Sequence, residues 1–179
     1  MRKLIFTLLL FSAALFTAYC QNGKLEVGMK APDWTFTDSD GKEFTMDSWP
    51  GKVLQVNYVD PDVSDLNDPL NDAIHKANDI DNRIKEDKFK GFGIVDCKST
   101  WKPNALIRII AGNKAKKYGT TILFDYKGTL QSSWQMPKDS YTVVIVDKKH
   151  ICRAIYHGEV PASEYENVIN LIIKLGEEE

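Results

Sequence analysis

The chain alternates between short apolar blocks and segments in which apolar residues recur every three or four positions. The blocks are rich in Val, Ile, Leu and aromatic residues, as buried strands are. They lie at 52–59, 91–95, 120–124, 129–135, 142–146 and 151–157. The periodic segments have the pattern of amphipathic helices. They lie at 69–88, 104–118 and 161–175.

The order of these elements predicts a parallel crossover followed by an antiparallel hairpin. A strand, helix, strand sequence such as 52–95 forms a right-handed parallel unit. Turn residues join 35–37 to 42–46 in a leading hairpin, and the turn at 147–150 joins the last two strands. A chain of 179 residues is too short for two ordinary domains. We therefore expect one α/β domain, with a central mixed sheet and helices on both faces.

The first twenty residues have the pattern of a secretory signal peptide. A basic start and the apolar run 4–16 precede Ala18 and Cys20, which suit the small-residue positions before a peptidase cut. The run is shorter than the ~20 residues that a membrane-spanning helix needs. We expect residues 1–20 to be removed and residues 21–179 to form an exported, periplasmic domain without a transmembrane segment.

Cys20 has a second interpretation, as the lipidated first residue of a lipoprotein tethered to the membrane. Tyr19 disfavours it, because lipoprotein signals normally place a small residue directly before the cysteine. Under either interpretation, Cys97 and Cys152 are the two cysteines of the folded domain. Two cysteines are too few for a disulfide scaffold, so a hydrophobic core must stabilise the domain.

Charge and composition exclude several classes of function. The formal net charge is −2, and no run of Lys or Arg is long enough to form a nucleic-acid footprint. The three histidines, at 75, 150 and 157, do not have the spacing of a metal site. No phosphate-binding loop is present, so no cofactor is expected. The expected partner is another exported protein or a small ligand.

Two segments carry a resemblance to known families. Val27–Lys42 resembles the opening of the thioredoxin-like peroxiredoxin and cytochrome-maturation families. Ser133–Met136, followed by Asp139–Lys148 and the helix start Gly158-Glu-Val-Pro, is similar to the YtfJ-like family of exported bacterial proteins. The resemblance covers about 25–175. It implies a thioredoxin-like three-layer fold, and that family has no settled biochemical activity.

Two positions depart from the redox members of these families. Their Cys-x-x-Cys motif falls on Val63–Leu66, which contains no thiol, and their cis-proline falls on Tyr141. Both halves of a disulfide-exchange site are then missing. We therefore expect a binding or interaction module without dithiol chemistry.

Cys97 is the candidate catalytic residue for the alternative function, a single-cysteine peroxidase or mixed-disulfide protein. It follows 91–95, at the carboxyl edge where open parallel sheets place their sites, and Lys98 could lower its pKa. A half-buried structural cysteine explains the same residue. Cys152 is expected to pack beneath the terminal helix. Two intervening strands would keep these two cysteines too far apart for a disulfide.

Candidate binding residues gather after the first buried strand and around the late strand. They are Asp60, Asp62, Asp65, Trp101 and Tyr141. The acidic run 60–72 is dense enough for a calcium loop, but it lacks the glycine and glutamate of such loops. Helix capping and solubility explain these acids, so no metal site is expected. The tryptophans are expected to pack in the core or at its rim, although Trp101 could also line an apolar pocket beside Cys97.

Overall fold

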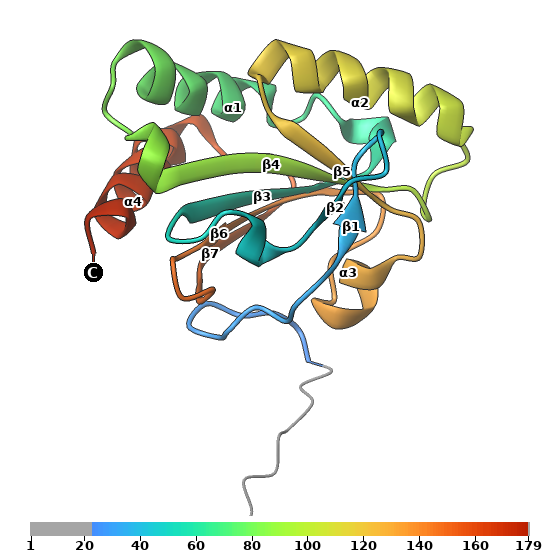
Figure 1. The fold of residues 1–179 in the computed structure, drawn as a ribbon, viewed down its shortest axis with the longest axis horizontal. Helices are drawn as coiled ribbons and strands as arrows, with labels where there is room; N and C mark the ends of the chain where they lie inside the picture. Colours follow the sequence, from blue (N-terminus) through green and yellow to red (C-terminus); the bar gives the residue numbers. More distant parts are fainter. Residues whose placement is uncertain (1–22, 179) are drawn as a thin grey trace, which may run out of the picture.

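The centre of the protein is a seven-stranded mixed sheet with strand order β2-β1-β5-β4-β3-β6-β7 (Figure 1). The structure, a computed structural model, describes residues 23–178, so the predicted signal peptide and Cys20 lie outside the described residues. The strands are β1 Phe36–Thr37, β2 Glu43–Phe44, β3 Val53–Val59, β4 Phe89–Asp96, β5 Thr121–Asp125, β6 Tyr141–Val146 and β7 Cys152–His157. β3, β4 and β5 are parallel, whereas β1, β2, β6 and β7 pair antiparallel. The predicted leading hairpin, parallel crossover and late hairpin are confirmed.

Helices cover both faces of the sheet, as predicted (Figure 1). They are α1 Asp68–His75, α2 Asn104–Tyr118, α3 Thr129–Ser133 and α4 Tyr165–Glu177. Single 3-10 turns occur at Met46–Ser48, Pro61–Val63, Glu86–Lys88 and Ala162–Glu164, and a π-helical turn at Lys76–Ile80. α1, α2 and α4 pack on one face, while α3 and the N-terminal segment pack on the other. None of the helices within 23–178 has the length and apolar character needed to cross a membrane.

β3 shows how the sheet divides its side chains between the two faces. Successive residues of a strand point to opposite sides. Leu54, Val56 and Tyr58 pack in the cluster that contains Trp34 and Trp134. Val53 and Val59 pack with α1 and α4 on the other face. Gln55 and Asn57 lie on that same helical face and interrupt its apolar pattern, although both are buried.

The predicted helix 69–88 is wrong in its second half. α1 gives way to the wide turn at Lys76–Ile80, and Asn82 at φ 52 turns the chain back. The amide of Ile84 then donates to the carbonyl of Ala77 at 3.1 Å. Ile84 therefore reaches the core from a turn, which gives the same apolar spacing as a helix.

The predicted strand 129–135 is also wrong, because its first part forms α3. The carboxylate of Asp125 accepts hydrogen bonds from the amides of Thr129 and Leu130, at 2.9 and 3.0 Å. Gly128 adopts the left-handed conformation, at φ 67, that starts this turn. The buried carboxylate satisfies the free amides of the helix start and overrides the local strand preference.

The prediction that Cys152 packs beneath α4 is wrong. A register shift in the β6–β7 hairpin sets Cys152 opposite Val146, and both side chains belong to the cluster on the other face. The Cys152 amide donates to the carbonyl of Met29 at 2.8 Å, so the N-terminal segment covers it. As predicted, two strands separate Cys152 from Cys97, and both thiols are free.

Candidate functional site

The segment after β3 contains carboxylates at the carboxyl edge of the sheet. Asp60 is 2% exposed, and its Oδ1 accepts the amide of Asp62 at 2.7 Å. Its own amide donates to the carbonyl of Ser140, directly before β6, at 3.0 Å. Burial, with Asp96 and Asp139 nearby, raises the pKa of Asp60. The capping role predicted for these acids is confirmed at Asp60.

Asp62 and Asp65 are held by basic side chains from the other side of this edge. Asp62 forms an ion pair with Lys102 and accepts the hydroxyl of Thr100 at 3.2 Å. Asp65 lies 2.8 Å from Lys114 Nζ, and this ammonium lowers the pKa of its carboxyl. Among residues 23–178, no group of three or more His, Cys, Asp or Glu is placed to hold a metal ion.

Cys97 is half-buried at the end of β4 and its thiol donates to the carbonyl of Val95 at 3.6 Å. Burial, together with the carboxylates of Asp96 and Asp125, raises its pKa to about 12. Arg108 is the cation that opposes this shift, and Lys98 does not contribute to it. A thiol with this pKa is almost entirely protonated at neutral pH, whereas the thiolate is the nucleophile.

Two buried carboxylates shape the loops around Cys97. Asp96 accepts the amides of Lys98 and Ser99, at 3.1 and 3.2 Å, and Asp125 caps α3. The hydroxyl of Tyr58 lies 3.5 Å from Asp125. An aspartate at the end of each parallel strand followed by turn residues is the sequence signal for this arrangement.

The tryptophan predictions are confirmed in part. Trp34 and Trp134 are core residues, and Trp49 stacks on Phe92 with ring centroids 4.5 Å apart. Trp101 is 84% exposed, so the expected packing is wrong for this residue. It lies in the loop before α2, where no core element covers it.

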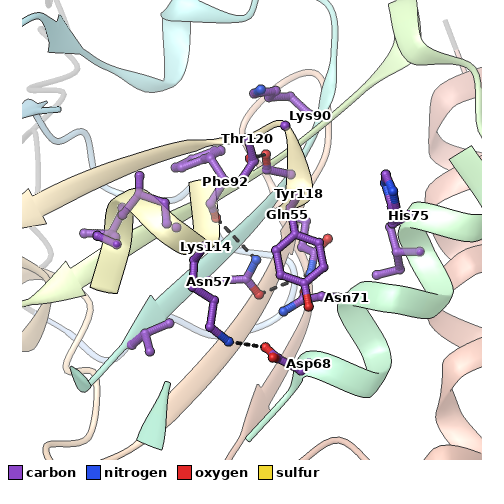
Figure 2. A pocket seen from close by; sticks show the side chains of 18 of the residues that line it. Gln55, Asn57, Asp68, Asn71, His75, Lys90, Phe92, Lys114, Tyr118 and Thr120 are labelled. Carbon is purple, nitrogen blue, oxygen red and sulfur yellow. Dashed lines mark hydrogen bonds and ion pairs between the residues drawn. The ribbon is translucent and has the colours of Figure 1, made fainter. Parts of the chain in front are cut away.

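A cavity of about 490 Å³ lies on the helical face, between α1 and α2 (Figure 2). Its floor is formed by neighbouring positions of β3 and β4, where Gln55 pairs with Gly91 and Asn57 pairs with Gly93. Both glycines remain partly exposed, although β4 lies between two other strands. This volume is within the range of small-molecule binding sites.

The cavity arises because α1 and α2 belong to different apolar clusters. Leu70 and Ile74 of α1 pack with α4, whereas Ile107 and Ala111 of α2 pack with Phe124. Between these clusters β4 contributes glycines, so no side chain fills the space.

Ion pairs close one end of the cavity. Lys114 of α2 pairs with Asp68 of α1 and donates to the carbonyl of Ser64 at 3.1 Å (Figure 2). Lys117 lies 3.4 Å from Asp72, one turn further along α1. These contacts hold the two helices at the spacing that leaves the cavity open.

A chain of hydrogen bonds crosses the floor. Gln55 Nε2 donates to Asn57 Oδ1 at 3.1 Å and to Asn71 Oδ1 at 3.0 Å. Asn57 Nδ2 donates to the carbonyl of Phe92 at 3.3 Å, and Asn71 Nδ2 donates to the Tyr141 hydroxyl at 3.1 Å. Burial raises the pKa of Tyr141, which keeps its hydroxyl protonated. The cavity therefore has an uncharged polar floor within apolar walls.

Of the residues that the sequence suggested, Tyr141 lines the cavity. Asp60, Asp62, Asp65, Cys97 and Trp101 are not among the residues that line it. The sequence analysis missed four of the residues that form its floor, which are Gln55, Asn57, Gly91 and Gly93. Two amides in an otherwise apolar strand, with two glycines in another strand, were the available signal.

Comparisons with known proteins agree with this fold. Residues 33–175 match the model of a family described as "Bacterial protein of unknown function (YtfJ_HI0045)". A comparison with curated proteins gives no match.

Solved structures of thioredoxin-like proteins are similar to this chain. The thioredoxin domain of a thiol-disulfide oxidoreductase from Bacteroides vulgatus has a TM-score of 0.62 and 15% identity, and the match covers 84% of this chain and 99% of that one. The exposed lipoprotein thioredoxin of Streptococcus pneumoniae has a TM-score of 0.58 and 17% identity, and the match covers 78% of this chain and 99% of that one. A peroxiredoxin-like protein from Aquifex aeolicus has a TM-score of 0.57 and 17% identity, and the match covers 86% of this chain and 89% of that one. At these identities the likeness establishes the thioredoxin-like fold.

Proposed function

The chain belongs to this family of bacterial proteins of unknown function, and we propose that it is an exported, non-catalytic binding protein for a small molecule. The ligand lies in the cavity between α1 and α2. The observation that carries this proposal is the pair of buried amides, Gln55 and Asn57, on a floor that Gly91 and Gly93 leave open.

The buried amides favour binding over a purely structural role. Moving an amide out of water is unfavourable unless all its hydrogen bonds are remade, and apolar residues of similar size avoid this cost. The neighbouring strand β6 carries Val143 and Ile145 at the positions that pair with Asn57 and Gln55. A sheet face needed only for packing would carry apolar residues such as Val and Ile at these two positions of β3 as well.

The alternative, a single-cysteine redox protein acting through Cys97, has less support. Its thiol has a pKa of about 12, raised by burial and by Asp96 and Asp125. The segment that resembles the redox motif position, Val63–Leu66, has no thiol to accept or resolve a disulfide. Redox activity of the thioredoxin-like relatives therefore does not transfer to this chain.

A fragment-binding experiment tests the proposed function. The purified, ¹⁵N-labelled protein is mixed with a library of small organic fragments, and the amide resonances are followed by NMR. We expect fragments that shift the side-chain amide signals of Gln55 and Asn57. Gly93→Val, which places a branched side chain in the cavity, should abolish these shifts. Gly112→Ala, in α2 with nothing near its added Cβ, should leave them unchanged.

Two results would refute the proposed function. One is a library in which no fragment shifts the cavity resonances. The other is a set of shifts that Gly93→Val leaves intact while the variant retains the native spectrum.

Export is part of the same proposal and rests on the pattern of residues 1–20. Fractionation of bacteria that express the full chain should place the shortened protein in the periplasm. A membrane-bound fraction that becomes soluble in Cys20→Ala would instead support the lipoprotein alternative.

A further inference from the structure

The direction of the hydrogen-bond chain on the cavity floor is fixed at one end by the backbone. The carbonyl of Phe92 can only accept, so Asn57 must present its NH₂ group to it. Asn57 Oδ1 then faces Gln55, which must present Nε2 in return. The orientation of both side-chain amides is therefore determined by which of their partner atoms can donate and which can accept.

The same reasoning extends to the other end of the chain. Gln55 Nε2 uses its second hydrogen on Asn71 Oδ1, so Asn71 presents its own NH₂ group to the Tyr141 oxygen. The Tyr141 hydroxyl oxygen is therefore the acceptor in this contact, and the hydroxyl hydrogen is not used in it. Residues 23–178 provide no hydrogen-bond acceptor for that hydrogen.

The chain of hydrogen bonds leaves one acceptor unpaired as well as one donor. Both hydrogens of Gln55 Nε2 are used, and no donor from the described part of the chain bonds to Gln55 Oε1. This oxygen lies over Gly91, where an added Cβ would come within 3.2 Å of it. The floor thus offers one free acceptor, Gln55 Oε1, and one free donor, the Tyr141 hydroxyl.

Ionisable side chains also line the cavity, and Figure 2 labels Asp68, His75, Lys90 and Lys114 among them. Most of them already have a contact within the protein. Lys114 pairs with Asp68, His75 with Asp79 at 2.7 Å, Lys52 donates to the Glu86 carbonyl at 2.7 Å, and Lys90 lies 6.0 Å from the centre of the Trp49 ring. A charged ligand group placed on the floor would lose its hydration against Gln55, Asn57 and Tyr141, which carry no charge.

We infer that the ligand is a small uncharged molecule with a carboxamide or lactam group attached to an apolar ring. Its carbonyl accepts the hydrogen of Tyr141, and its N–H donates to Gln55 Oε1. The apolar ring packs against Ile74, Ile110 and Ile122, which line the walls. This inference rests on the proposed function and specifies the chemistry of its ligand.

Three probes of equal shape and different charge test the ligand class. They are 2-naphthamide, 2-naphthoate and 2-naphthylmethylammonium, each titrated into the purified protein at neutral pH and followed by NMR. We expect 2-naphthamide to bind at least about tenfold more tightly than either charged probe. Tighter or equal binding of a charged probe in the cavity would overturn the ligand class and leave the proposed function intact. Failure of all three probes and of the fragment library to enter the cavity would overturn both.

Tyr141→Phe tests the donor separately. The variant should bind 2-naphthamide about fivefold to tenfold more weakly, because one neutral hydrogen bond is lost. 2-Methylnaphthalene has no polar group, so its affinity should not change. Equal affinity of the variant and the unchanged protein for 2-naphthamide would refute the role of Tyr141.

Discussion

Asn57 and Gly93 occupy paired positions on the parallel strands β3 and β4, so that a buried amide lies beside a residue with no side chain. The neighbouring pair, Gln55 and Gly91, repeats the arrangement. An amide alone would make a polar defect in the core, and a glycine alone would leave a small void. Together they give a polar floor with room above it.

Gly93→Ala should stabilise the fold and weaken ligand binding. Gly93 does not have a positive φ, and an added Cβ would contact Ile122 at 3.6 Å, which is an ordinary van der Waals distance. The free energy of unfolding should rise by about 0.5 to 1 kcal/mol, because alanine restricts the unfolded chain. Urea denaturation measures this change. Gly112→Ala should give a gain of similar size in α2 with no effect on binding, and a loss of stability in Gly93→Ala would contradict the prediction.

Gln55→Leu combined with Asn57→Leu should abolish ligand binding without unfolding the protein. Both this double variant and Gln55→Leu alone remove the Gln55 donor from Asn71 Oδ1. Replacing both partners of the Gln55–Asn57 hydrogen bond by apolar groups of similar shape is otherwise nearly neutral, whereas Gln55→Leu alone also leaves Asn57 Oδ1 unpaired. We expect the single variant to lose about 1 to 3 kcal/mol and the double variant to lose less than the single one. Urea titrations of the two variants decide this. A double variant that is the less stable of the two would mean that the amides serve the fold.

Cys97 should alkylate slowly at neutral pH. Its pKa of about 12 lies well above the ordinary thiol value, so the thiolate is scarce until the solution is strongly basic. The rate of reaction with iodoacetamide should keep rising from pH 7 to pH 10, and Cys97→Ser gives the background from Cys152. A rate that levels off below pH 8 would contradict this prediction and support the single-cysteine redox alternative.

Asp147→Asn should reduce the loss of stability in acid. Burial alone would raise the pKa of Asp147, but the amides of Ile151 and Lys149 and the guanidinium of Arg153 hold it below the ordinary value. A carboxyl with a lowered folded-state pKa stabilises the protein above its unfolded pKa of about 4, and this stabilisation is lost as the pH falls. Urea denaturation at pH 7 and at pH 3.5 should therefore show a smaller difference for the variant.

Asp60→Asn is the control for this prediction, since the pKa of Asp60 is raised mainly by burial. A carboxyl with a raised folded-state pKa destabilises the protein at neutral pH and does so less as the pH falls. This variant should therefore gain stability at pH 7 and show a larger difference between the two pH values. The same response in both variants would contradict the assignment of opposite shifts.

The sequence predicted the elements whose signals are local. β3 and β4 are apolar blocks, α2 ends at Gly119, which adopts φ 57, and the turn at 147–150 is confirmed. The sequence analysis failed where a hydrogen bond that spans several residues of a turn decides the conformation. Asp125 converts 129–133 into a helix, and a turn after α1 places Ile84 in the core.

By itself the sequence determined the α/β order of the chain, its thioredoxin-like fold and the absence of cysteine from Val63–Leu66. Only the tertiary structure decided that Gln55 and Asn57 share a floor with Gly91 and Gly93, and that Tyr141 and Asn71 complete the chain of hydrogen bonds above it. The physical reason is strand register: Gln55 and Gly91 meet because parallel β3 and β4 pair residue by residue. No local pattern of residues encodes that register, because the paired residues lie far apart in the sequence.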